Sequence, residues 1–168
     1  MTVMKRSRMY YTKVSLAAVV ALLFAILLLS PSMSAAESEG GHKVSNEVGL
    51  FLGNTHHSGE DGFSIGIDYE HRINDLFGVG GLIEYADGKF DAWVVGVPLY
   101  VHPYMGLRFL AAPGFVSEDS ETKFLFRAGI GYQIELGNNW SITPGYNLDL
   151  VEGNEPAHVY GLSIGFGF

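Results

Sequence analysis

Residues 160–168 read Tyr-Gly-Leu-Ser-Ile-Gly-Phe-Gly-Phe, and this C-terminal stretch decides the fold. Tyr160, Leu162, Ile164, Phe166 and Phe168 alternate with glycine and serine. A β-strand with this period of two has one large apolar face and one almost bare face. The apolar face needs lipid or a second sheet against it, and the bare face suits a crowded interior. The stretch therefore favours the closing strand of a transmembrane β-barrel.

Seven further segments with the same period precede this strand. They lie at about 46–53, 63–73, 77–86, 91–101, 105–115, 123–136 and 140–150, and the last strand starts near Ala157. A transmembrane strand needs about 9–11 residues with one apolar face. Glycine and serine dominate the other face, which suits a narrow barrel interior better than the solvent face of a sandwich. The sequence thus predicts an all-β fold, an eight-stranded antiparallel up-and-down transmembrane β-barrel.

The connections and the aromatic residues give this barrel a direction. Short turns at 74–75, 102–103 and 137–139 alternate with longer polar loops at 54–62, 117–122 and 152–156, and with a shorter one at 86–89. Outer-membrane barrels keep short turns on the periplasmic side, so both ends of the barrel domain are expected there. Two aromatic rows should then point outward. They are Phe63, Tyr85, Trp93, Phe115, Phe124, Tyr146 and Tyr160 at the outer interface, and Tyr69, Phe77, Tyr132, Trp140 and Phe168 at the inner one.

Three prolines interrupt this pattern. Pro98, Pro113 and Pro144 fall inside predicted strands, although a closed barrel has no free edge to hold a residue without an N–H. We expect bulges or irregular hydrogen-bond ladders at these positions.

The N-terminal region has the layout of a secretory signal peptide. A basic segment from Lys5 to Lys13 precedes an apolar run from Val14 to Leu29, and small residues end at Ala36. The run is short for a membrane-spanning helix, which needs about 20 residues. We therefore predict a cleaved signal peptide helix at 1–36, a short periplasmic lead-in at 37–44 and the barrel at 45–168. An uncleaved anchor helix is the alternative.

Composition excludes several kinds of protein. The chain has no cysteine, so disulfides and thiolate metal sites are ruled out. Residues 37–168 hold 6 basic and 18 acidic groups, a net charge of −12. Such a chain does not bind nucleic acid through phosphate contacts. Its acidic surface is suited to attract divalent cations.

Charged residues also occur on the predicted inward face. An eight-stranded lumen is just wide enough for side chains to fill, so these charges are expected to pair. Counting from the last short turn places Arg127 opposite Asp149, and Glu47, Glu70 and Arg72 should cluster near the periplasmic end. The predicted ion-pair residues are Arg127, Asp149, Glu47, Glu70, Arg72, Arg108 and Glu135, with Asp68 and Glu84 on the same face. Structural plugging of the lumen and an ion pathway are both open.

Three histidines fall at the outer rim. His56 and His57 lie in the first predicted outer loop, and His158 begins the last strand, which neighbours the first in a closed barrel. Histidine with nearby carboxylates is a candidate for a divalent-metal site. With Ser58 it is also a candidate acid–base pair. Solvated loop histidines with no such role are the alternative reading.

The whole pattern resembles the small eight-stranded outer-membrane barrels of the OmpX and OmpA-barrel type over residues 45–168. In that family the ending Tyr160…Leu162…Ile164…Phe166…Phe168 implies a signal that the barrel assembly machinery reads. Some relatives are lipid A-modifying enzymes with a His and a Ser two residues apart near the last strand. Here Tyr160 stands two residues after His158, so that motif is missing.

The sequence and the resemblance together imply a non-enzymatic protein of the cell outer membrane with a structural or surface-interaction role. We expect no cofactor and a monomer, with outer-membrane lipids, lipopolysaccharide and the assembly machinery as partners. A narrow channel for small solutes and a lipid A-modifying enzyme are the alternatives.

Overall fold

The computed structural model describes residues 45–168 apart from 89, 119 and 120. The predicted signal peptide at 1–36 and lead-in at 37–44 lie outside the described residues. Within the described part, no helix is long and apolar enough to cross a membrane.

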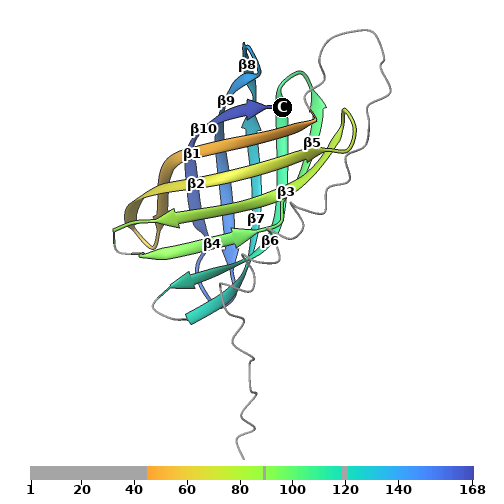
Figure 1. Cartoon of the computed structure of the whole chain (residues 1–168). Coiled ribbons are helices and arrows are strands. Elements are labelled where there is room, and N and C mark those ends of the chain that lie inside the picture. The colour runs from red at the N-terminus through yellow and green to blue at the C-terminus, as the bar shows by residue number, and fades with distance from the viewer. Residues whose placement is uncertain (1–44, 89, 119–120) are drawn as a thin grey trace, which may run out of the picture. The chain divides into compact units, whose positions relative to one another are not determined.

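The described residues form one antiparallel sheet that closes into a barrel (Figure 1). Its strand segments are β1 (Asn46–His57), β2 (Glu60–Arg72), β3 (Phe77–Ala86), β4 (Ala92–Gly96), β5 (Leu99–Tyr104), β6 (Leu107–Glu118), β7 (Glu121–Tyr132), β8 (Ile134–Gly137), β9 (Trp140–Val151) and β10 (Ala157–Gly167). β4 and β5 follow one another as the fourth barrel strand, and β7 and β8 form the sixth. Eight strands therefore surround the lumen, and the predicted fold class is confirmed.

The C-terminal stretch closes the barrel. β10 pairs with β9 on one side and with β1 on the other, over a register from Glu47↔Gly167 to His56↔His158. Figure 1 shows the first and last strands side by side near the C-terminus. Backbone bonds between Asn46 and Phe168 extend this pairing to the chain end, with N–O distances of 3.1 and 2.8 Å. The predicted closing strand is confirmed.

The two ends of the barrel differ. The end that holds Asn46 and Phe168 also holds the connections at 73–76, 105–106 and 138–139, and we call it the terminus end. The opposite end holds the connections at 58–59, 87–91 and 152–156, and we call it the loop end.

Several predicted connections were wrong. β1 and β2 run past the predicted loop at 54–62 and meet in a two-residue turn at Ser58 and Gly59, whose φ angles are 52° and 81°. The turn predicted at 102–103 lies within β5, and the chain reverses at 105–106 instead. Polar residues caused the first error, because strand ends that project beyond the apolar belt carry polar side chains as loops do. The second error came from Pro103, because proline is typical of turns, whereas His102 beside it faces Glu70 at 2.7 Å.

The three prolines differ in their effect. Val97 and Pro98 separate β4 from β5, yet Gly80 N still donates to Pro98 O at 2.9 Å, so the ladder is irregular without a slip. Pro144 lies opposite the break between β7 and β8, because the β7–β9 pairing ends at Gly131↔Gly145 and β8 resumes at Ile134↔Ile142. Pro113 lies in a regular ladder opposite Phe126 of β7, but on its other side it faces the gap between β4 and β5, where the pairing stops at Gly96↔Gly114 and resumes at Leu99↔Ala111.

Large apolar side chains cover the outside of the barrel. Residues such as Leu50, Ile67 and Phe126 are exposed on alternate positions of β1, β2 and β7. Most of the predicted outward aromatic residues are exposed as well. At the loop end these are Phe63, Trp93, Phe115, Phe124, Tyr146 and Tyr160, and at the terminus end they are Phe77, Tyr132, Trp140 and Phe168. This belt has no protein partner within the described chain.

Small residues on β1 and β10 make room for an aromatic ring inside. A Cβ placed on Gly53 or on Gly161 would overlap the Phe51 ring. Phe51 therefore fills the lumen beside Gly161, while Gly165 further along the same face makes room for Ser141 and Glu47.

Candidate functional site

The candidate site is the lumen, where charged side chains from strands far apart in the sequence meet. In the half nearer the loop end, Arg127 on β7 is buried between two carboxylates that are also buried. Its Nε and Nη2 donate to Asp149 Oδ1 and Oδ2 at 2.6 and 2.8 Å. Its Nη1 donates to Glu84 Oε2 at 2.6 Å. The structure thus brings Arg127 and Asp149 together, as predicted. It adds Glu84 from β3, which is separated from β7 by two barrel strands, β4–β5 and β6.

Apolar side chains fill the lumen beside this cluster. Leu82, Val94, Ala112 and Leu125 form a buried group with Leu110, Val116 and Val151 packed against it. Ala86, Phe90 and Ala92 form a second buried group that also contacts Val116. Sequence reasoning expected a small and polar interior and missed this layer. The signal was present in the alternation of β3 and β4. Leu82 and Val94 have the same parity as the inward-facing Glu84, which indicates that they also face the lumen.

A second polar cluster occupies the half nearer the terminus end. His102 Nε2 lies 2.7 Å from Glu70 Oε1, while Arg72 Nε and Arg108 Nη1 lie 3.7 and 3.8 Å from the Glu70 carboxylate. Glu70 is buried, with 2 % of its surface exposed. One carboxylate is therefore neutralised by two arginines and held by an imidazole, which compensates the cost of burying it.

Gln133 links this cluster to the first strand. Arg72 Nη2 donates to Gln133 Oε1, and Gln133 Nε2 donates to Glu47 Oε2, both at 2.7 Å. Glu47, Glu70 and Arg72 thus belong to one network, in which Gln133 connects Arg72 to Glu47. His102 and Gln133 were missed as site residues, although His102 shares the parity of Tyr100 on the same strand.

Arg108 and Asp68 lie between the two clusters. The guanidinium carbon of Arg108 lies 5.0 Å from the centre of the Tyr100 ring, a cation–π contact with a buried phenol. Ser163 Oγ on β10 donates to Asp68 Oδ1 at 3.3 Å. Glu135 differs from the other predicted residues, because it lies exposed on β8 and joins neither cluster among the described contacts.

Little space remains at mid-height. A cavity of about 60 Å³ lies among Asp68, Glu84, Tyr100, Arg108 and Arg127. By this measure one water needs about 10–15 Å³, so the space holds only a few molecules. The larger hollow of about 1040 Å³ lies at the terminus end.

The rim histidines are divided between the two faces of the wall. His56 and His158 are paired across β1 and β10, with ring centres 6.5 Å apart. His56 Nδ1 lies 3.0 Å from Asp61 Oδ1, and His158 Nδ1 lies 2.6 Å from Tyr146 Oη. His57 instead lies against Phe90, with ring centres 6.2 Å apart. Within the described residues, no group of three or more His, Cys, Asp or Glu side chains is arranged to hold a metal.

Ser58 does not complete a catalytic triad with His57. Ser58 Oγ lies 3.3 Å from His57 Nε2 and donates to Glu155 Oε2 at 3.2 Å. In a triad the acid binds the other nitrogen of the histidine and orients it. Here Glu155 binds the serine, and His57 Nδ1 is buried with no hydrogen-bond partner in the described part of the chain.

A closed barrel with an apolar outer belt and a filled polar lumen defines a transmembrane β-barrel protein. Residues 21–168 match the family described as "Outer membrane protein beta-barrel domain". The chain belongs to this family and is a protein of the cell outer membrane.

Solved structures agree in fold. The N-terminal barrel of Pseudomonas aeruginosa OprF is 15% identical with a TM-score of 0.54, covering 75% of this chain and 100% of that one. The attachment invasion locus protein Ail of Yersinia pestis, solved with the heparin analogue sucrose octasulfate, is also 15% identical, with a TM-score of 0.52 and coverage of 74% and 97%. A de novo designed transmembrane barrel is 12% identical with a TM-score of 0.51, covering 77% and 100%. No curated protein matches the sequence.

Proposed function

We propose that this protein is a non-conducting, non-catalytic barrel with a structural role in the outer membrane. The filled middle of the lumen carries the proposal. Arg127, Glu84 and Asp149 hold the walls together through three bonds of 2.6–2.8 Å. Packed apolar groups lie beside them, and the remaining cavity measures about 60 Å³. A solute path would need these ion pairs to break inside a low-dielectric interior, which costs several kcal/mol.

Single-channel recording in planar bilayers tests the sealed lumen. The purified, refolded barrel should give no conductance steps, while a general porin inserted under the same conditions gives steps. Regular conductance steps from this protein would contradict the sealed lumen and support a narrow channel for small solutes instead.

The outer rim supports the non-catalytic part of the proposal. Glu155 binds Ser58, and among the described residues no acid binds His57 Nδ1 to orient its imidazole. Incubating the barrel with lipopolysaccharide should leave every acyl chain in place by mass spectrometry. Loss of an acyl chain from the lipid A part would establish the enzyme alternative.

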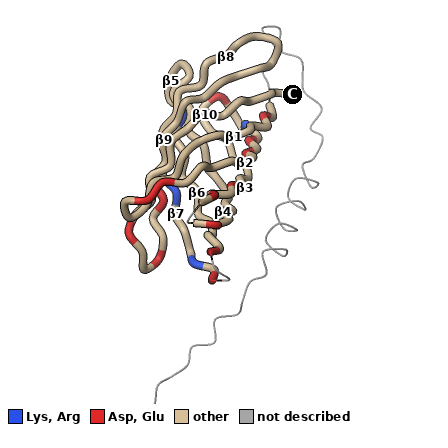
Figure 2. The backbone as a smooth tube through the Cα atoms, turned by 90° about the vertical axis from the view of Figure 1, so that its left-hand side faces the viewer, with Lys and Arg blue, Asp and Glu red and all other residues tan. Residues whose placement is uncertain are grey.

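The proposed partners follow from the two surfaces of the barrel. The exposed belt of Leu50, Ile67 and Phe126 is suited to lipid acyl chains. Several acidic positions lie at the loop end, away from the C-terminus (Figure 2). They include Glu60, Asp61, Asp87, Asp91, Glu118, Glu121, Glu152 and Glu155. Such a rim is suited to lipopolysaccharide whose phosphates are bridged by divalent cations. The family resemblance supports β10 as the strand that the assembly machinery binds, and we propose that the barrel acts as a monomer.

A further inference from the structure

A notch opens in the wall at the terminus end, between two hairpins of unequal length. The β5–β6 hairpin reverses at Met105 and Gly106, and its last bond to the next strand is from Gln133 N to Gly106 O, at 2.6 Å. The β8–β9 hairpin continues past this point to its turn at 138–139. β8 pairs with β9 alone among the described strands, so its other edge faces the notch.

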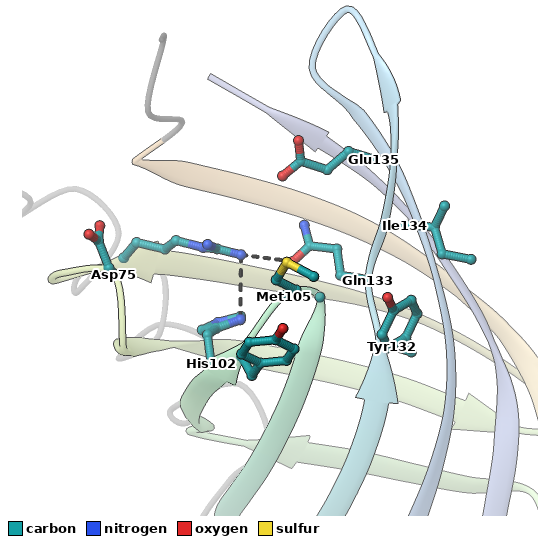
Figure 3. Close-up of a pocket in the computed structure, with 10 residues that line it drawn as sticks. Asp75, His102, Met105, Tyr132, Gln133, Ile134 and Glu135 are labelled. Carbon is teal, nitrogen blue, oxygen red and sulfur yellow. Dashed lines mark hydrogen bonds between the residues drawn. The ribbon is translucent and has the colours of Figure 1, made fainter. Parts of the chain in front are cut away.

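A pocket of about 480 Å³ occupies this notch. Arg72, His102 and Gln133 line it, and Arg72 is joined to the other two by the bonds that Figure 3 marks as dashed lines. Asp75 and Glu135 also line it. Figure 3 shows Gln133 and Glu135 projecting from one side of the strand, and Tyr132 and Ile134 from the other.

The pocket presents charges of both signs. Arg72 is held in place by Gln133 Oε1 at 2.7 Å and His102 Nδ1 at 3.5 Å, and its Nε lies 3.7 Å from Glu70 Oε1. A guanidinium carries five N–H donors, more than these contacts use, and its planar fork matches a phosphate. Glu135 lies exposed on β8 and supplies a carboxylate. A ligand that is only anionic would face Glu135 and Asp75, whereas a zwitterion meets partners of both signs.

The outer side of the pocket is apolar and aromatic. Tyr104 and Met105 are 70% and 72% exposed, and Tyr132 and Ile134 are 51% and 41% exposed. Tyr132 belongs to the same exposed aromatic row as Trp140 and Phe77, which outer-membrane barrels place at the membrane interface. The pocket therefore lies where lipid head groups meet acyl chains.

We propose that this notch binds the head group of a zwitterionic phospholipid, with the phosphate on Arg72 and the ammonium on Glu135. The acyl chains lie outside the wall against Met105, Tyr132 and Ile134. The lipid site is additional to the structural role proposed above. The conductance measurement tests only that role, and the lipid site is tested separately by lipid binding.

Native mass spectrometry of the refolded barrel tests the site with three probes. Phosphatidylethanolamine carries both charges, phosphatidylglycerol carries only the negative one, and inorganic phosphate is the free anion. We expect a retained phosphatidylethanolamine adduct in preference to phosphatidylglycerol. Glu135→Gln removes the partner of the ammonium and should lower that preference about two- to fivefold, the size of one partly exposed ion pair.

Glu152→Gln is the matched control, because it makes the same change at an exposed position of the loop end. It should leave the preference unchanged. Equal retention of the two lipids, or an unchanged preference in Glu135→Gln, would overturn the proposal. Complete displacement of the lipid by inorganic phosphate would also overturn it, because the pocket would then be a simple anion site.

Discussion

Arg127 shows how one side chain holds three strands of the barrel. Its guanidinium lies 2.6 Å from Glu84 and 2.6 Å from Asp149, both of which are buried. Removing the guanidinium would leave Glu84 and Asp149 buried without their partner. Breaking a buried ion pair on one side costs about 3–5 kcal/mol, far more than the pair itself contributes.

Arg127→Met should therefore lower the free energy of unfolding by about 3–5 kcal/mol. Urea titration of the barrel in lipid vesicles, followed by tryptophan fluorescence, measures this change. Lys123→Met on the same strand is the control, because Lys123 is near the surface and its pair with Glu121 spans 3.8 Å. An exposed pair contributes about 0–1 kcal/mol. Adding Glu84→Gln and Asp149→Asn to Arg127→Met should recover part of the loss, and equal stabilities for wild type and Arg127→Met would refute the role of the cluster.

The sequence predicted only one of the two partners of Arg127. Asp149 is on a neighbouring strand, so counting from the predicted turn at 137–139 gives the register Arg127↔Asp149. Glu84 meets Arg127 across the lumen, from a strand that is not a neighbour. That contact depends on the diameter and stagger of the closed barrel, which a residue count does not supply. Gln133 was missed for the same reason, whereas His102 was missed because it was assigned to a turn at 102–103 and not to β5.

At the scale of the element, the hairpin turns determine where strands end. Asn138 and Asn139 have φ angles of 51° and 65°, and Gly137 before them has 85°. Asparagine tolerates this left-handed region better than most residues, and a β-branched residue does not. The turn between β8 and β9 was predicted at 137–139 from these residue types, because the chemistry of a tight turn is local.

Asn139→Val should destabilise the barrel by about 1–2 kcal/mol, since valine must adopt a positive φ at this turn. Asn139→Gly is the matched control and should be neutral within about 0.5 kcal/mol, because glycine adopts the same angle freely. The same urea titration measures both variants. A valine variant as stable as the glycine variant would show that the turn adopts another conformation.

The strands at the loop end could not be delimited in the same way. Asn54, His56 and Asp61 lie in β1 and β2 but are polar on the outward face. Alternation marks a strand only where one face meets lipid. Beyond that height both faces are polar, so the periodic signal stops before the strand does.

For the whole molecule, closure depends on the pairing of the first and last strands, and the stretch Tyr160–Phe168 forms one side of that seam. Leu50 and Ile164 are paired across it, and both belong to the outward face. Paired residues of antiparallel strands have Cα atoms about 4.5–5.5 Å apart, within the range of a disulfide. Because the chain has no cysteine of its own, an intramolecular disulfide can form only between two introduced cysteines, and it then reports that their strands are paired.

Cross-linking of Leu50→Cys with Ile164→Cys in isolated outer membranes is the most direct measurement of this closure. Oxidation should form an intramolecular disulfide, seen as a gel shift that reductant reverses. Leu50→Cys with Ile130→Cys is the control, because Ile130 lies on β7, which pairs with β6 and β9, and it should stay reduced. A seam pair that stays reduced, or a control pair that links equally well, would contradict the closed eight-stranded barrel.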